Sequence, residues 1–184
     1  GINLLYPRYH DISSTQSRLF NPNGYRFVEL PLFNVIHAFL VNILPYFSLE
    51  VLGRLLAILS SLVSSYLVFL IGKRFMNKWA GILAAGFFTF LPFNVYFTRV
   101  ILPDPMAIAF ALMASWVFIK FLDGEKDILL YLSGLLFAVS LLIKPFTAFY
   151  FVPAIYLLLN KYDLKTIIRD SKLLAKFLIF VGIV

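Results

Sequence analysis

The sequence predicts an all-α protein, and more specifically a polytopic membrane helical bundle. Of its 184 residues, 61% are apolar or aromatic and only 14% are charged, whereas a soluble domain is about 45–50% apolar and about 25% charged. The mean hydropathy is +0.90. A soluble chain of this length leaves about a third of its surface in water, so one core cannot hide this apolar excess. The composition therefore excludes a soluble globular enzyme and a disordered tail.

The charges are those of a membrane protein with a preferred orientation. Sixteen Lys and Arg stand against nine Asp and Glu, which gives a net charge of +7. In a membrane protein such an excess sets topology, so we expect membrane lipid as a partner and no nucleic acid. The absence of Cys excludes disulfides and thiolate metal sites.

The first part of the chain, residues 1–47, is expected to form a loop and a juxtamembrane helix. Residues 1–32 are polar and contain an Asn-Pro-Asn-Gly turn, which is typical of a loop outside the hydrocarbon. The next apolar run, Leu32–Pro45, is interrupted by two Asn and one His. It is shorter than the roughly 20 residues that a span needs, and an interfacial or re-entrant helix suits it better.

Residues 51–184 are expected to hold the transmembrane helices of a single domain. The charge-poor stretches predict spans at Val51–Gly72, at Trp79–Phe97 and at Met106–Phe118 with its flanks. Ile128–Leu159 is apolar except for Lys144, and it predicts a helical hairpin broken at Lys144-Pro145 that either crosses twice or dips and returns.

We expect the chain to be an internal fragment of a longer polytopic protein. It begins with Gly-Ile-Asn and ends within the apolar run Leu173–Val184. That run is too short for a span of about 20 residues, so the last helix is expected to be truncated.

Positive charges predict which face of the membrane each loop occupies. Lys and Arg gather at 73–78, 120–126 and 161–176, so we expect these segments on the cytoplasmic side and the turns at Arg99 and Lys144 on the outside. The first loop is then extracytoplasmic if the juxtamembrane helix lies in the interface. If that helix spans, the loop moves inside, and the Lys and Arg counts alone favour this arrangement.

Asp104 is the acid with the most informative surroundings. It stands in Arg-Val-Ile-Leu-Pro-Asp-Pro, between two predicted spans. An Asp followed by Pro is typical of a helix start with the carboxylate as N-cap. An ionisable group at membrane depth also commonly marks a substrate path. The two roles are compatible.

The other candidate residues each have a structural and a functional interpretation. Glu29 lies on a turn before Pro31 and is either a solvated loop acid or part of a site. Asp11 follows His10, a weak pattern for a metal, and a solvated loop acid is the favoured interpretation of it. Arg54 and Lys144, in apolar helices, either snorkel to the headgroups or pair with a lipid phosphate. No phosphate-binding Gly-rich loop or nucleophile elbow occurs.

Several short motifs in order resemble a known family. They are Asn-Leu-Leu-Tyr-Pro at 3–7, Glu-Leu-Pro-Leu at 29–32, Gly-Arg-Leu at 53–55, Gly-Lys-Arg-Phe at 72–75, Trp-Ala-Gly at 79–81 leading to Leu91-Pro92, and Arg-Val-Ile-Leu-Pro-Asp at 99–104. Together they resemble the membrane glycosyltransferases of the GT-C class, in the branch of the protein O-mannosyltransferases and lipid A aminoarabinose transferases (glycosyltransferase family 39 and relatives).

The resemblance implies a cell-membrane, multi-pass enzyme with an extracytoplasmic active site. It would move a sugar from a polyprenyl-phosphate donor to a protein, lipid or glycan hydroxyl. Glu29 and Asp104 would be catalytic acids, Glu29 also helping to hold a possible divalent metal. Arg54, Arg99 and Lys144 would bind the donor phosphate, and we place Asp11 with them. The family's principal catalytic acid would lie upstream of Gly1, so the isolated fragment is expected to be inactive.

Two other classes of function remain open at this stage. One is a non-enzymatic transporter or flippase for a lipid-linked or anionic substrate, which would use the same cations but would need broken helices and polar groups near the midplane. The other is a structural subunit of a membrane complex, with its charges at the interfaces.

Overall fold

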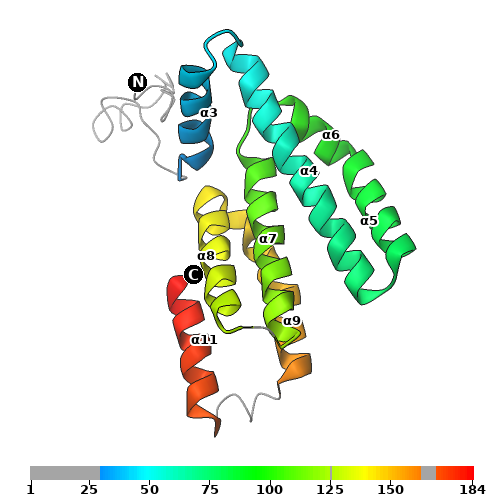
Figure 1. Cartoon of the computed structure of the whole chain (residues 1–184), viewed down its shortest axis with the longest axis vertical. Coiled ribbons are helices and arrows are strands. Elements are labelled where there is room, and N and C mark those ends of the chain that lie inside the picture. Colours follow the sequence, from blue (N-terminus) through cyan, green and yellow to red (C-terminus); the bar gives the residue numbers. More distant parts are fainter. Residues whose placement is uncertain (1–29, 125, 163–168) are drawn as a thin grey trace, which may run out of the picture.

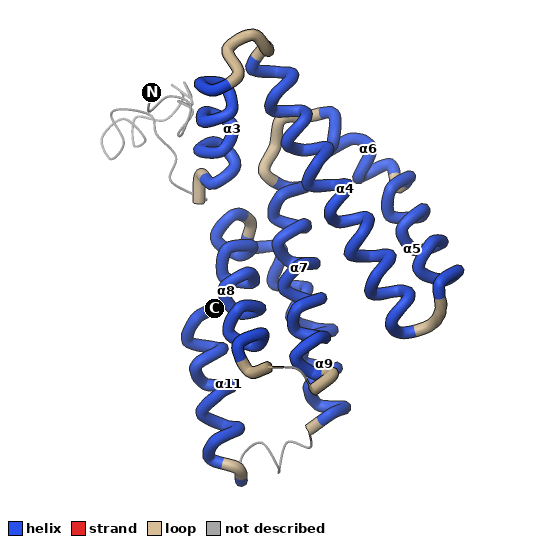
Figure 2. The backbone as a smooth tube through the Cα atoms, in the orientation of Figure 1, coloured by secondary structure: helices blue, strands red, loops and turns tan. Residues whose placement is uncertain are grey.

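The computed structural model describes residues 30–124, 126–162 and 169–184, and within these ranges it is helical without strands. The helices run alternately up and down through the molecule (Figures 1 and 2). They are α3 (Leu32–Ile43), α4 (Leu49–Phe75), α5 (Lys78–Phe90), α6 (Pro92–Arg99), α7 (Asp104–Leu122), α8 (Ile128–Ile143), the 3₁₀ helix η1 (Pro145–Tyr150), α9 (Phe151–Lys161) and α11 (Ser171–Ile183). The predicted all-α fold is confirmed.

The longest helix, α4, has well-defined signals at both ends. Ser48 caps it by accepting a hydrogen bond from the Val51 N–H at 3.3 Å. Lys73 and Arg74 lie in its last turn, where cations interact favourably with the helix dipole. The uninterrupted apolar run between these ends forms 27 residues of helix, which is longer than the predicted Val51–Gly72 and more than enough to cross a bilayer.

The predicted span Trp79–Phe97 forms two helices with a sharp bend between them, which together make either one broken span or a re-entrant loop. α5 begins after Asn77, whose side chain accepts from the Ala80 N–H at 2.9 Å. It stops at Phe90, and α6 follows at an angle of 54°. The cause is Pro92, which forces the preceding Leu91 into an extended conformation with ψ 132°.

Close contacts and buried polar groups hold the α5–α6 pair against α4. A Cβ atom on Gly81 would lie 2.6 Å from the carbonyl oxygen of Phe69, and one on Gly72 would lie 2.9 Å from the Cα of Gly81. The close approach of α5 to the α4 backbone therefore needs Gly at both positions. The Ser61 hydroxyl donates to the Asn94 side chain at 3.0 Å. The Ser65 and Thr89 hydroxyls are 2.9 Å apart. These interhelical bonds satisfy polar groups inside an apolar environment.

The predicted hairpin is confirmed, including its break. α8 ends at Ile143, and Lys144 is extended at φ −150° and ψ 116° because Pro145 follows it. η1 turns the chain, and α9 returns beside α7. The last apolar run forms α11, which packs on α8. An aromatic core joins α7, α8 and α11 through Phe118, Phe137 and Phe180.

A second, smaller core lies near the start of α7. It contains Phe33 of α3, Met106 and Ala107 of α7, and Ile143 of α8, all nearly inaccessible to solvent. The buried His37 fastens α3 to α4, because its Nε2 lies 2.8 Å from the carbonyl oxygen of Leu49. The juxtamembrane helix is therefore packed onto the bundle.

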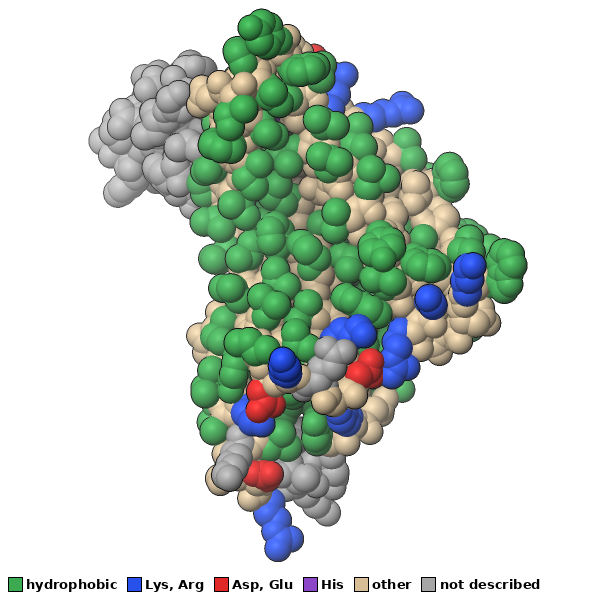
Figure 3. All heavy atoms as spheres, in the orientation of Figure 1, with side chains coloured by type: hydrophobic (Ala, Val, Ile, Leu, Met, Phe, Trp, Pro, Cys, Tyr) green, Lys and Arg blue, Asp and Glu red, His purple; other side chains and the backbone are tan. Residues whose placement is uncertain are grey.

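Length and composition make two of the described helices, α4 and α7, able to cross a membrane, and a third span results if the bent pair α5–α6 is one. The shorter apolar helices include α3 and α8. Figure 3 shows hydrophobic side chains over the middle of the visible face and many of the charged ones towards its lower end.

The lower end in Figures 1 and 3 is named here the basic end, and it holds the C-terminal ends of α4, α7 and α9 and the start of α5. The predicted grouping of basic segments on one face agrees with the contacts between them. Arg74 pairs with Asp123, with 3.0 Å between Nε and Oδ2. The Lys161 ammonium donates to the carbonyl of Leu122. Lys176 pairs with Asp127.

Candidate functional site

Asp104 is the first residue of α7, and the prediction that its carboxylate is the N-cap is wrong. Pro103 occupies the cap position with helical backbone angles (φ −75°, ψ −10°), and no side chain caps the helix. The helix thus begins one residue earlier than the Asp-Pro pattern predicts. The carboxylate lies in the first turn, where the helix dipole favours an anion, and it is available for a distant partner.

That partner is Lys144, at the break between α8 and η1. Its Nζ lies 3.8 Å from Oδ2 of Asp104. The two side chains are 20% and 14% exposed, Lys144 first, so the pair is mostly withdrawn from solvent and still reachable. Forty residues of chain separate the two groups, and the pair joins the start of one helix to the end of the next.

The surrounding backbone fixes where Lys144 stands. Thr147 donates its hydroxyl to the Lys144 carbonyl at 2.8 Å, which holds the turn before η1. One turn earlier, the fully buried Ser140 donates its hydroxyl to the Ala107 carbonyl of α7 at 2.8 Å. This hydrogen bond therefore joins α7 and α8, the two helices that carry the ion pair, one turn away from the pair.

The first described residue, Leu30, lies close to the Asp104–Lys144 pair. Leu30 donates its N–H to the carbonyl of Leu142 at 2.7 Å, two residues before Lys144. Glu29 and Asp11 lie outside the described residues.

Arg54 and Arg99 flank this region without joining the ion pair. Arg54 lies in α4 next to Gly53, at which a Cβ atom would lie 2.7 Å from Ile101 in the loop before α7. Its guanidinium is 3.7 Å from Glu50, and both side chains are more than half exposed. Arg99 is exposed at the end of α6. Among the described residues, no ion pair links either arginine to Asp104.

The Asp104–Lys144 pair offers one cationic and one anionic group to a ligand. A Lys ammonium is a compact charge with three donors, which suits a phosphate oxygen, and a carboxylate accepts a hydroxyl proton or hydrogen bond. Because both side chains are largely withdrawn from solvent, each compensates part of the charge of the other. Within the described part of the chain, no group of three or more His, Asp or Glu is placed so that it could hold a metal ion.

Sequence reasoning missed the residues that support the pair. Ser140 precedes Lys144 by one helical turn, and a small polar residue at that spacing in an apolar helix was an available signal. The contact of Ser140 with Ala107 could not be predicted from a local pattern, because these residues are 33 positions apart on two different helices.

The fold and these residues define a membrane-embedded α-helical protein with a partly buried ion pair at one end of its bundle. The family model of the dolichyl-phosphate-mannose-protein mannosyltransferases matches residues 30–184. The chain therefore belongs to this family of membrane glycosyltransferases, as its motifs predicted. Comparison with curated proteins and with solved structures gives no match.

Proposed function

We propose that the chain contributes the donor-phosphate site of a multi-pass membrane glycosyltransferase. The enzyme moves a sugar from a polyprenyl-phosphate donor to a hydroxyl of a protein, lipid or glycan. The observation that carries this proposal is the 3.8 Å ion pair between Asp104 and Lys144, which lies at the end of α7 opposite the basic end. The family match supports the class of reaction.

In the proposed reaction, cations stabilise the charge that develops as the phosphate leaves the sugar. Lys144 is the cation closest to Asp104 in the described structure. Arg54 and Arg99, exposed on neighbouring elements, supply further positive charge towards the lipid headgroups. A lipid-linked donor requires its phosphate to reach the site from the bilayer, which agrees with a site at a helix end.

The carboxylates serve the acceptor side of the same site. Asp104 orients the acceptor hydroxyl or the sugar, and its ion pair with Lys144 holds the carboxylate at a partly buried position. We assign Glu29 to the same site because its neighbour Leu30 is bonded to Leu142. Asp11 is assigned to the donor side from the resemblance alone, and the general base is not assigned to any residue of this chain.

Sugar transfer measured in membranes with the intact protein tests this proposal. Lys144→Gln removes a charge-assisted contact of about 1.5–3 kcal/mol, so kcat/KM for the polyprenyl-phosphate donor should fall by about 10- to 150-fold. Lys144→Arg should retain more activity than Lys144→Gln. Asp104→Asn should lower kcat more than it raises KM for the donor. Lys78→Gln, an equal charge change at the basic end, is the matched control. Unchanged kinetics in Lys144→Gln would exclude the proposed site.

The orientation in the membrane needs its own experiment. The chain has no Cys, so single cysteines introduced at positions 102 and 124 report on opposite ends of α7. In sealed vesicles, a membrane-impermeant thiol reagent should label position 102 from the extracytoplasmic side and position 124 from the cytoplasmic side. The reverse pattern would place the ion pair on the cytoplasmic side and remove the proposed orientation.

One observation favours the alternative of a transporter or flippase. The 54° break between α5 and α6, with the buried Ser61–Asn94 contact close to it, is the kind of interrupted helix that transport proteins use. Movement of a labelled donor across vesicles without sugar transfer would support this alternative. Transfer without movement would support the enzyme.

A further inference from the structure

A pocket of about 220 Å³ lies at the basic end, far from the Asp104–Lys144 pair. It is formed where α4, α7 and α9 all reach their C-terminal ends. Its walls are mainly apolar and its polar groups belong to one carboxylate, one amide and two cations. The lining residues are Arg74, Phe75, Ile119, Leu122, Asp123, Leu157, Asn160 and Lys161.

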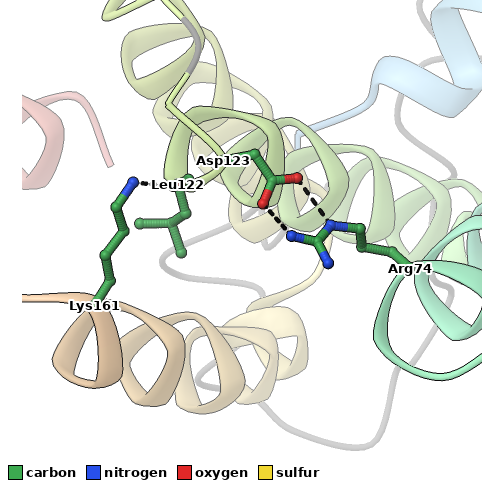
Figure 4. A network of polar contacts seen from close by, with 4 residues as sticks. All are labelled: Arg74, Leu122, Asp123 and Lys161. Atoms are coloured by element: carbon green, nitrogen blue, oxygen red, sulfur yellow. Dashed lines mark hydrogen bonds and ion pairs between the residues drawn. The ribbon is translucent and has the colours of Figure 1, made fainter.

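Both cations of this pocket make contacts at the C-terminal end of α7 (Figure 4). Arg74 grips the Asp123 carboxylate through its Nε and Nη2 atoms, while Lys161 donates to the Leu122 carbonyl at the end of α7. These contacts use only part of the available donors, because a guanidinium has five N–H groups and an ammonium has three. Donors therefore remain for another acceptor.

The charges around the pocket do not balance among the described residues. Two cations, Arg74 and Lys161, line the pocket beside one lining carboxylate, Asp123. The hydrogen bonds from Arg74 are the largest cause of the lowered pKa of Asp123. The Arg74–Asp123 pair uses one of these two cations. The other cation lies beside the apolar walls of the pocket, where the helices leave the hydrocarbon. This combination of a positive charge and an apolar surface matches an amphiphile with an anionic head.

We propose that this pocket binds the phosphate headgroup of an anionic phospholipid from the adjacent leaflet. Lys161 and Arg74 bind the phosphate oxygens, and the glycerol and upper acyl chain lie against Phe75, Ile119 and Leu157. The site is separated from the ion pair by the length of α7, about 28 Å for 19 residues. It binds a resident lipid and is independent of the proposed sugar donor.

Native mass spectrometry of the intact protein tests the proposal. The protein is released from nanodiscs that contain phosphatidylglycerol and excess phosphatidylcholine, and bound lipid is counted. Lys161→Gln should weaken phosphatidylglycerol binding at least about tenfold, since a charge-assisted contact is lost. Lys161→Arg should retain it. Lys78→Gln, which removes an equal charge from an exposed site outside the pocket, should change binding less than about twofold.

Asp123→Asn separates this proposal from a purely structural role of the network. Removing the carboxylate frees Arg74 for the phosphate, so phosphatidylglycerol should bind more tightly even though the helix ends lose a contact. Weaker binding in Asp123→Asn would mean that the network only joins helices, and would overturn the proposal. So would equal losses in Lys161→Gln and Lys78→Gln, or no preference over phosphatidylcholine. Displacement by millimolar inorganic phosphate would assign the pocket to a soluble anion instead.

Discussion

Gly53→Ala is a sharp test of how the site is assembled. An added Cβ atom would lie 2.7 Å from Cγ2 of Ile101, and 3.0 and 3.1 Å from Cε1 and Nε2 of His37, well inside the ordinary contact distance of about 3.5–4.0 Å. Neither the Ile101 nor the His37 side chain can move aside easily. Ile101 is β-branched and stiff at χ1, and the His37 ring is held by its bond to Leu49.

The expected cost follows from two opposing contributions. Overpacking costs about 1–3 kcal/mol, and replacing Gly by Ala within a helix returns about 0.5–1 kcal/mol. The free energy of unfolding should therefore fall by about 0–2.5 kcal/mol. Gly86→Ala is the matched control, because a Cβ there meets nothing within 4 Å, so this variant should become more stable by about 0.5–1 kcal/mol.

Reversible unfolding of the intact protein in mixed micelles measures both variants. The difference between them isolates the steric contribution, since both gain the same helix propensity. Transfer activity should also fall in Gly53→Ala, because Ile101 lies three residues before Asp104. Equal changes in the free energy of unfolding for the two variants would refute the close packing of α3, α4 and the loop before α7.

Three further predictions concern other contacts. The pKa of Asp123 is lowered, chiefly by its hydrogen bonds to Arg74. Its ionised form therefore stabilises the folded state above the unfolded pKa of about 4. This stabilisation is lost as the pH falls through the lower pKa of the folded state. The melting temperatures of wild type and Asp123→Asn should thus differ at pH 7 and converge below about pH 4, and a constant difference would contradict the pairing. Gly81→Ala should loosen α5 from α4 and lower the unfolding free energy by about 1–2 kcal/mol, and an increase would argue against their close approach. Ser140→Ala removes one buried interhelical hydrogen bond and should cost about 0.6–1.5 kcal/mol by equilibrium unfolding, whereas no cost would mean that this bond does not help to hold α7 against α8.

Local sequence signals predicted the elements whose structure is determined by residues close in the sequence. An uninterrupted apolar run is enough to predict α4, and Lys144-Pro145 is enough to predict the break after α8, because Pro acts on its immediate neighbour. The break at Leu91-Pro92 carries the same signal. It was missed because uniform hydrophobicity on both sides of the Pro resembled one continuous span.

The site depended on contacts that no local pattern contains. Asp-Pro correctly marked the start of α7 but suggested a capping role, whereas the carboxylate faces Lys144 forty residues away. The pairing of Arg74 with Asp123 likewise joins residues 49 apart. Such pairs follow from how helices pack, and in this chain packing is set by small residues such as Gly53 and by apolar contacts spread over several helices.

Photo-crosslinking with a polyprenyl phosphate that carries a reactive group beside the phosphate would test the proposed donor site most directly. In the intact protein, we expect labelled peptides around Asp104 and Lys144, with labelling lost in Lys144→Gln and retained in Lys78→Gln. Labelling of the peptides around Arg74 and Lys161 instead would place the donor phosphate at the basic end and would contradict the proposed donor site at Asp104 and Lys144.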